Sequence, residues 1–298
     1  MTRLALQRQR PGAAQAHRAP HPAVSTTELR KVAGTENFPV ALWFLPKKHR
    51  RHLMAIYVYA RFVDYIGDEA PGDRATLLRK VSRDLDELFA GSEPRDEVMR
   101  VLGETVREVG IPREPLDDLI TANLTDQQVR EYRTYEQLLD YCSYSANPVG
   151  NLVLYVFGDH TPANEKLSDK ICTALQILEH LQDIAEDAGN GRIYLPAEDR
   201  ERFGVSTEEL TRAPASRGLR ALTAFEAQRA VRLLDEGEPL LGELRGAGRI
   251  AVSGFLAGGR ATAAAIAAAN FDTIGSQVSP SKARTAALAL RSLVGGRG

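Results

Sequence analysis

Two acidic pairs, each embedded in a long apolar helical pattern, most constrain how this chain can fold. The stretch "FVDYIGDE" places Asp64 and Asp68 four residues apart, and "LQDIAEDAG" does the same with Asp183 and Asp187. An α-helix turns by about 100° per residue, so residues four apart lie on one face. Because apolar residues occupy the flanking positions of both stretches, we expect both acidic faces to line one internal cavity.

The rest of the chain is also patterned for helices. Apolar residues recur at helical spacing, Gly and Pro residues mark the ends, and no alternating strand pattern of useful length occurs. We therefore predict a single all-α domain over 27–298, folded as a helical bundle around a central cavity. The expected helices are 46–70, 73–90, 94–109, 112–123, 135–158 with a kink at Asn147-Pro148, 162–188, 198–203, 206–211, 216–235, 238–245, 248–272 and 281–293.

Composition excludes some classes of function and indicates a compartment. The 38 basic and 39 acidic residues give a formal charge of −1, so nothing global attracts nucleic acid. Residues 1–26 contain no Asp or Glu but four Arg and three Pro, and we predict a disordered basic tail rather than a transit peptide. Two cysteines provide no disulfide framework, which is typical of the cytoplasm.

One apolar stretch, 250–271, is the candidate for a membrane span. Arg260 lies in its middle, and Ala and Gly outnumber Leu and Ile. We predict a buried helix rather than a span. Peripheral contact with the inner face of a membrane stays open.

Each acidic pair belongs to a longer polar stripe. Positions i, i+4, i+7 and i+11 of a helix fall within a narrow band. Both bands carry side chains that could contact a substrate. Their members are Tyr57, Arg61, Asp64 and Asp68 on the first helix, and Gln176, His180, Asp183 and Asp187 on the second, with Glu179 one step to the side.

Carboxylates that face a shared cavity repel one another and are poorly solvated. Mg²⁺, or Mn²⁺ as an alternative, would relieve this repulsion, because Mg²⁺ prefers oxygen ligands and commonly bridges a few carboxylates to substrate phosphates. Arg61 would be a direct cationic partner of a diphosphate. The competing interpretation is two solvated helix faces, since acidic pairs at this spacing are common. The matching stripes with apolar flanks favour a metal–diphosphate site.

These motifs resemble those of the squalene/phytoene synthases, the head-to-head trans-isoprenyl diphosphate synthases, from about residue 34 to 293. That family carries D-x-x-x-D on one helix and a second aspartate motif on another, followed by a segment like "GRIYLP". The resemblance implies an isoprenoid (terpenoid) synthase bundle in which the four motif aspartates are catalytic and bind the metal. It also implies that Tyr141, in "YCSYSANPVG", lies near the diphosphate and a carbocation, and that Arg61 binds diphosphate.

Departures from the family pattern narrow the expected reaction. Glu179 replaces the usual Asn of the second motif, Gln182 replaces an Arg, and Asn147 stands within "SANPVG". Less positive charge weakens the case for a site that holds two diphosphates. The variants resemble the hydroxysqualene synthase branch of bacterial hopanoid biosynthesis. That branch would convert presqualene diphosphate, supplied by a sister synthase, into hydroxysqualene for a separate oxidoreductase, without NADPH.

Two alternatives remain at this point. One is a condensing synthase that joins two farnesyl or geranylgeranyl diphosphates into presqualene diphosphate, squalene or phytoene. The other is a helical scaffold without turnover, which the two intact aspartate pairs disfavour. In either enzyme we expect the substrate to contact Tyr57, Arg61, Asn147, Gln176, Glu179, His180 and Gln182. Glu179, His180 and Gln182 are candidates for placing the attacking water, and the sequence leaves open which residue does so.

Overall fold

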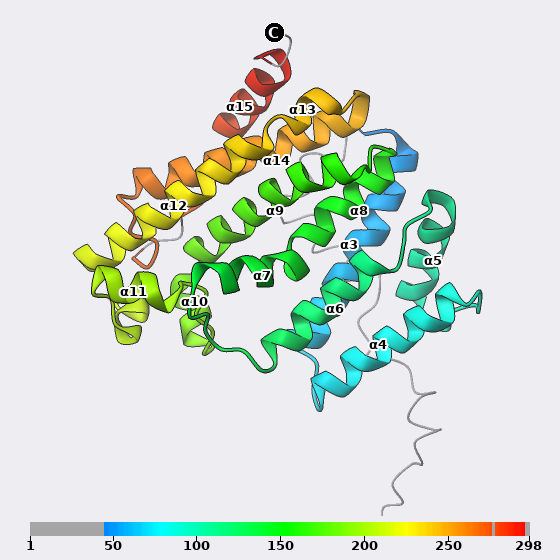
Figure 1. Cartoon of the computed structure of the whole chain (residues 1–298), viewed down its shortest axis with the longest axis horizontal. Coiled ribbons are helices and arrows are strands. Elements are labelled where there is room, and N and C mark those ends of the chain that lie inside the picture. Colours follow the sequence, from blue (N-terminus) through cyan, green and yellow to red (C-terminus); the bar gives the residue numbers. More distant parts are fainter. Residues whose placement is uncertain (1–44, 276–277, 296–298) are drawn as a thin grey trace, which may run out of the picture.

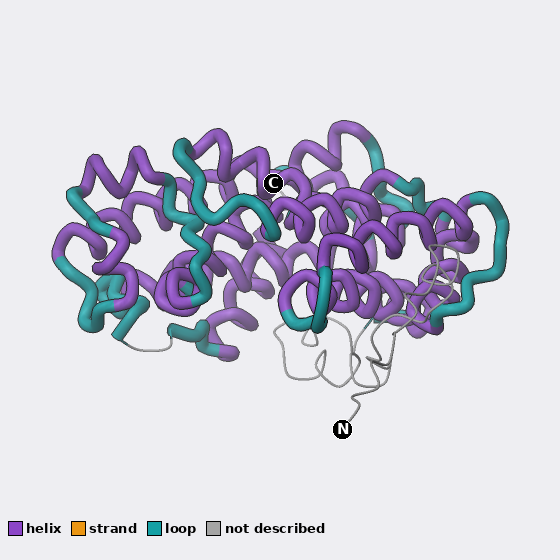
Figure 2. Tube along the Cα trace, turned by 90° about the horizontal axis from the view of Figure 1, so that it is seen from below, coloured by secondary structure: helices purple, strands orange, loops and turns teal. Residues whose placement is uncertain are grey.

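A computed structural model describes residues 45–275 and 278–295. All regular elements in these ranges are helices (Figure 2), which confirms the predicted all-α class. The expected basic tail 1–26 lies outside the described residues. The helices are α3 (Lys47–Asp68), α4 (Arg74–Phe89), α5 (Glu97–Val109), α6 (Glu114–Asp126), α7 (Tyr135–Ser145), α8 (Asn147–Phe157), α9 (Pro162–Gln182), α10 (Ile184–Gly189), α11 (Ala197–Phe203), the 3₁₀ turn η2 (Thr207–Thr211), α12 (Arg217–Gly237), α13 (Leu240–Glu243), α14 (Gly246–Ala268) and α15 (Lys282–Gly295).

The helices pack around two hydrophobic cores that meet at α8. One core surrounds α3, α4, α5 and α6, and the other surrounds α7, α9, α12 and α14. Helix α8 contributes Leu152 and Val153 to the first core and Leu154 to the second. Figure 1 shows α8 and α9 between the group formed by α12, α13 and α14 and the group formed by α3 to α6. The two acidic motifs therefore belong to different cores and are brought together by tertiary packing.

The helix expected over 135–158 is two helices. Helix α7 ends at Ser145, and α8 begins at Asn147 after a break at Ala146. Pro148 in the first turn of α8 has no backbone N–H to continue the ladder of α7, which accounts for the break where the sequence predicted a kink. The hydroxyl of Thr173 on α9 donates to Asn147 Oδ1 over 2.9 Å, so this corner is tied to the second motif helix.

The prediction of a single helix over 162–188 is wrong for its last turns, where the structure has a break at Asp183. Helix α9 ends at Gln182, Asp183 has φ −104° and ψ 14°, and α10 follows from Ile184. The backbone N–H of Asp187 still bonds to the carbonyl of Asp183 over 2.8 Å, so the chain bends without opening into a loop. Ile184 is buried in a core that includes Leu210 of η2. Packing of α10 on η2 therefore redirects the chain at Asp183, which helical periodicity alone cannot show.

Helix α14 is, by length and composition, able to cross a membrane, with a mean hydropathy of 1.4. Half of that apolar window is buried inside the protein, and α14 packs against α8, α9, α12 and α15. Arg260 at its middle bonds to Asp235 over 2.7 Å and to Glu238 over 2.8 Å. These contacts are those of a helix packed within the fold, as the sequence predicted.

Candidate functional site

The first acidic motif lies at the end of α3, where α6 crosses it. Asn123 Nδ2 donates to Asp64 Oδ1 over 3.1 Å, and Arg61 Nη1 lies 3.9 Å from Asp64 Oδ2. Desolvation raises the pKa of Asp64 to about 6; the Asn123 bond and the Arg61 charge lower it, whereas the Asp68 and Glu179 charges raise it. The raised pKa means that the surroundings do not fully compensate the negative charge of ionised Asp64, as expected for a carboxylate that binds a cation.

Gly67, between the two aspartates, permits this crossing. A Cβ at Gly67 would lie 2.0 Å from Asn123 Oδ1, which is closer than any side chain could tolerate. Gln127, one turn further along, donates from Nε2 to the Gly67 carbonyl over 3.0 Å. The glycine of "DYIGD" is therefore required for the approach of α6, which carries the hydrogen-bond donor of Asp64.

Replacing Asn123 with alanine is expected to raise the pKa of Asp64 above 6. A hydrogen bond to an ionised group contributes about 1.5–3 kcal/mol, and about 1.36 kcal/mol corresponds to one pKa unit, so a rise of about 1–2 units is expected. Carboxyl ¹³C NMR of the metal-free protein measures it, with Asp64→Asn to assign the resonance. Gln127→Ala is the control, because Gln127 bonds to a carbonyl and not to the carboxylate. An unchanged Asp64 titration in Asn123→Ala would contradict the assignment.

The second motif spans the bend between α9 and α10. Desolvation raises the pKa of Asp183 to about 6; the charges of Glu179, Asp187 and Glu186 raise it further, and His180 lowers it. Asp183 is therefore another carboxylate that is costly to ionise without a cation. Asp183 lies at the bend, between Glu179 on α9 and Glu186 and Asp187 on α10, and the charges of all three act on it.

His180 connects the members of the second stripe. Its Nε2 lies 3.1 Å from Gln176 Nε2, and its Nδ1 lies 3.6 Å from Asp187 Oδ2. The imidazole stacks on the ring of Tyr194, with centroids 3.7 Å apart and planes at 10°. Gln176, His180 and Asp187 therefore lie in sequence along one face, as their spacing predicted, in spite of the bend.

Two charged side chains link the motifs across the cores. Arg192, in the segment after α10, donates from Nη2 to Asp68 Oδ1 over 2.8 Å. Glu179 on α9 acts electrostatically on both Asp64 and Asp183. Asp68 and Glu179 are exposed, so these carboxylates face a more open space than the enclosed cavity that we expected. Asp68 is the last residue of α3, which leaves it less covered than mid-helix positions.

The donor set suits a hydrated magnesium ion. Among the residues that the structure describes, no group of three or more His, Cys, Asp or Glu side chains is arranged to hold a metal ion. Mg²⁺ ordinarily keeps several waters and binds through one or two carboxylates plus substrate phosphates. Two carboxylates with raised pKa values, Asp64 near the end of α3 and Asp183 at the bend after α9, fit that mode, with phosphate oxygens supplying the remaining ligands. The metal roles of the four aspartates stay predictions.

A cluster of aromatic rings, which sequence reasoning missed apart from Tyr141, lies beside the second motif. Tyr141 on α7 donates its hydroxyl to Asp126 Oδ2 over 2.8 Å, and Tyr194 donates to Asp126 Oδ1 over 3.3 Å. The ring of Tyr132 lies 5.3 Å from that of Tyr141 and 5.9 Å from that of Tyr194. Arg192 and Tyr194 could have been found within "GRIYLP", next to the motif, but Asp126 and Asn123 carry no comparable signal.

Three predicted substrate contacts are engaged elsewhere in the fold. Tyr57 is buried in the core around α3, and Asn147 accepts the hydroxyl of Thr173. Gln182, the last residue of α9, donates from Nε2 to the carbonyl of Val278 over 2.5 Å. Their roles in substrate binding stay predictions.

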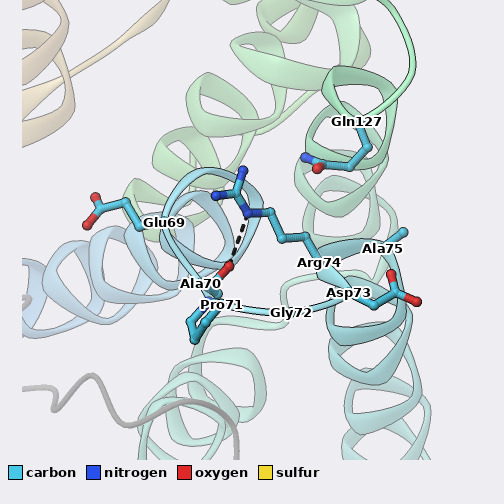
Figure 3. A pocket seen from close by; sticks show the side chains of 8 residues that line it. All are labelled: Glu69, Ala70, Pro71, Gly72, Asp73, Arg74, Ala75 and Gln127. Carbon is cyan, nitrogen blue, oxygen red and sulfur yellow. Dashed lines mark hydrogen bonds between the residues drawn. The ribbon is translucent and has the colours of Figure 1, made fainter. Parts of the chain in front are cut away.

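Two pockets adjoin the motifs. One, of about 500 Å³, lies at the turn from α3 to α4 (Figure 3), where Arg74 Nε donates to the carbonyl of Ala70 over 3.1 Å. Its charged lining is mixed, with Glu69 and Asp73 beside Arg74, and so does not favour an anion. A smaller pocket lies against the second motif. It is lined by His180, Ile184, Asp187, Arg192, Ile193, Tyr194, Leu195 and Leu210.

Comparison with known proteins decides the family. The sequence model of the squalene/phytoene synthases matches residues 32–285, which is most of the chain. The chain belongs to the squalene/phytoene synthase family. Members of this family process prenyl diphosphates, so the protein is an enzyme of that class, as the motifs predicted.

Similar proteins agree with this membership. A hydroxysqualene synthase of Rhodopseudomonas palustris is 34% identical over 224 residues, which cover 74% of this chain and 76% of the relative. A phytoene synthase of Mycobacterium tuberculosis is 31% identical over 185 residues, covering 61% and 60%. The solved squalene synthase HpnC from Alicyclobacillus acidocaldarius superposes with a TM-score of 0.76 at 38% identity, covering 83% and 94%. A dehydrosqualene synthase, at 24% identity and a TM-score of 0.82 over 90% and 94%, shares the fold.

Proposed function

We propose that the protein is a hydroxysqualene synthase, which converts presqualene diphosphate and water into hydroxysqualene and diphosphate. Similarity to two hydroxysqualene synthases, each 34% identical, supports the choice within the family. The structural observation that carries it is the position of Glu179, whose charge acts on a carboxylate of each motif.

The charge of the site suits one diphosphate better than two. Glu179 adds negative charge beside the four aspartates, and Gln182, where the family commonly has arginine, bonds to a backbone carbonyl. Within residues 45–275 and 278–295, Arg61 and Arg192 lie within ion-pair distance of motif aspartates, Arg61 of Asp64 and Arg192 of Asp68. Holding two diphosphates would demand more compensating charge than these groups supply. A substrate that is already condensed brings a single diphosphate.

In the proposed reaction the motif aspartates bind the metal and two arginines bind the diphosphate. Asp64, Asp68, Asp183 and Asp187 would hold Mg²⁺, with Mn²⁺ as an alternative. When bound, the metal neutralises charge on the leaving diphosphate. Arg61 and Arg192 would donate hydrogen bonds to its oxygens. The bond between carbon and the diphosphate oxygen breaks with its electron pair leaving on diphosphate, the carbocation rearranges, and a water oxygen forms the new bond and loses a proton.

Feeding purified protein with presqualene diphosphate and Mg²⁺, without reductant, is expected to yield hydroxysqualene, detected by mass spectrometry. Parallel incubations with farnesyl and geranylgeranyl diphosphate are expected to yield no C30 or C40 product, and NADPH is expected to change nothing. Product from farnesyl or geranylgeranyl diphosphate alone would instead establish a condensing synthase, the candidate that the similar phytoene synthases support.

The proposal also implies a place in a reaction sequence. A separate synthase must supply the condensed diphosphate, and an oxidoreductase would consume the alcohol. Because the reaction exchanges one carbon–oxygen bond for another, it needs no reductant.

A further inference from the structure

The hydroxyl of Tyr141 donates a hydrogen bond to the buried carboxylate of Asp126. Asp126 is 8% exposed and receives the hydroxyls of Tyr141 and Tyr194, one on each oxygen. Tyr141 is also 8% exposed, and its ring centroid lies 6.4 Å from that of His180, the residue beside Asp187. Tyr141 thus joins the second motif to a carboxylate that has no role in the mechanism above.

The hydrogen bond to Asp126 determines which hydrogen-bonding role the Tyr141 hydroxyl has left for a reacting molecule. A tyrosine hydroxyl has one proton to donate and lone pairs to accept with. Because the Tyr141 hydroxyl donates its one proton in the hydrogen bond to Asp126, it can take part in a further hydrogen bond only as the acceptor. A water that attacks a carbocation must point a lone pair at the carbon and its hydrogens at acceptors, which is the orientation that such a hydroxyl imposes.

We propose that Tyr141 orients the water that captures the carbocation, and that Asp126 is the positioning residue that makes Tyr141 a hydrogen-bond acceptor and receives the released proton. The water oxygen bonds to carbon and gives a proton to Tyr141 Oη, while the Tyr141 proton passes to Asp126 Oδ2. Charge balances because the cation is discharged as the Asp126 carboxylate becomes neutral. The inference rests on the proposed function, since it concerns the water of that reaction.

The surroundings of Asp126 suit a proton acceptor. The groups that act on it include Tyr141 from α7, Tyr194 and Arg192 from the segment after α10, Tyr132 from the segment before α7, and Asp68 from α3. Burial raises the pKa of Asp126 above its usual value, the tyrosine bonds and Arg192 oppose the rise, and Asp68 adds to it. The 2.8 Å bond from Tyr141 provides the path for the proton.

The test measures how each variant partitions presqualene diphosphate between hydroxysqualene and elimination hydrocarbons, with Mg²⁺ in ¹⁸O-labelled water. Tyr141→Phe removes the acceptor, and Asp126→Asn can donate to Tyr141 and so reverse the bond. Both are expected to lower the ratio of alcohol to hydrocarbon by about tenfold or more, with KM within about threefold of wild type. Asp126→Glu is expected to restore part of the ratio.

Tyr59→Phe is the matched control. Tyr59 is a fully buried tyrosine whose hydroxyl bonds to the carbonyl of Leu116 over 2.9 Å, so the same atom is lost away from the site and the product ratio should stay unchanged. A wild-type product ratio in folded Tyr141→Phe and Asp126→Asn would overturn the inference and leave the proposed function standing. A wild-type protein that forms no alcohol from presqualene diphosphate would overturn the proposed function, and the inference with it.

Discussion

Asp64→Asn and Asp183→Asn are each expected to lower kcat with presqualene diphosphate by at least about 10²-fold, the order of effect seen when one group that stabilises developing charge is removed. Asparagine keeps the shape and one oxygen of each side chain but removes the negative charge that would hold Mg²⁺. Steady-state kinetics at saturating Mg²⁺ measures the loss. Asp84→Asn, on helix α4 and outside both aspartate motifs, is the control and is expected to stay near wild type.

The same two variants are expected to leave stability equal or higher in metal-free buffer. Both carboxyls have folded-state pKa values raised to about 6, above those of the unfolded chain, chiefly by desolvation. Their ionised forms are therefore disfavoured by folding, and stability is lost as pH rises through about 6. Asparagine removes this loss at pH 7.5. Full activity would remove either residue from the site, and a large drop in melting temperature would make it structural.

Arg229→Met is expected to destabilise the protein by about 3 kcal/mol or more, because it leaves buried carboxyls without their cation. Arg229 bonds to Asp199 over 2.5 Å and to Glu226 over 2.9 Å, and these two residues are 3% and 1% exposed. Its guanidinium also lies 4.1 Å from the ring centroid of Tyr135 and 4.3 Å from that of Phe225. Urea unfolding at pH 9 measures the change, because this is above the pKa of about 8 to which desolvation raises Glu226, so that Glu226 is ionised beside Arg229 in the wild-type protein.

Acidification is expected to reduce this deficit. Desolvation raises the pKa of Glu226 to about 8, and Arg229 opposes that rise, so without Arg229 the carboxyl stays neutral to a higher pH. Since the folded-state pKa exceeds the unfolded one, stability is lost on ionisation and regained as pH falls below it. Arg51→Met, which breaks an exposed pair with Glu108, should cost less than about 1 kcal/mol. Equal losses in the two variants would contradict the role of burial.

Much of the fold followed from local patterns. The expected helices 73–90, 94–109 and 216–235 correspond to α4, α5 and α12, because amphipathic periodicity and terminal Gly or Pro residues are properties of the local chain. The bend at Asp183 did not follow, because it depends on α10 packing against η2. The break at Ala146 was anticipated only as a kink, although proline chemistry marked its place.

The site divides in the same way. Helical spacing was enough to place Gln176, His180 and Asp187 along one face, and the motif pattern was enough to identify the family. Periodicity tells which face of a helix is buried, but it does not tell which element will cover that face.

Only tertiary packing decided which side chains meet. The Arg192–Asp68 pair joins residues 124 positions apart, and the Asn123–Asp64 bond joins residues 59 apart. Asp126 reaches Tyr141 because α6 and α7 pack together, and Tyr194 because Ile193 N–H bonds to the Arg130 carbonyl. Such contacts form when two hydrophobic cores close around shared helices, and no local feature of the chain encodes that closure.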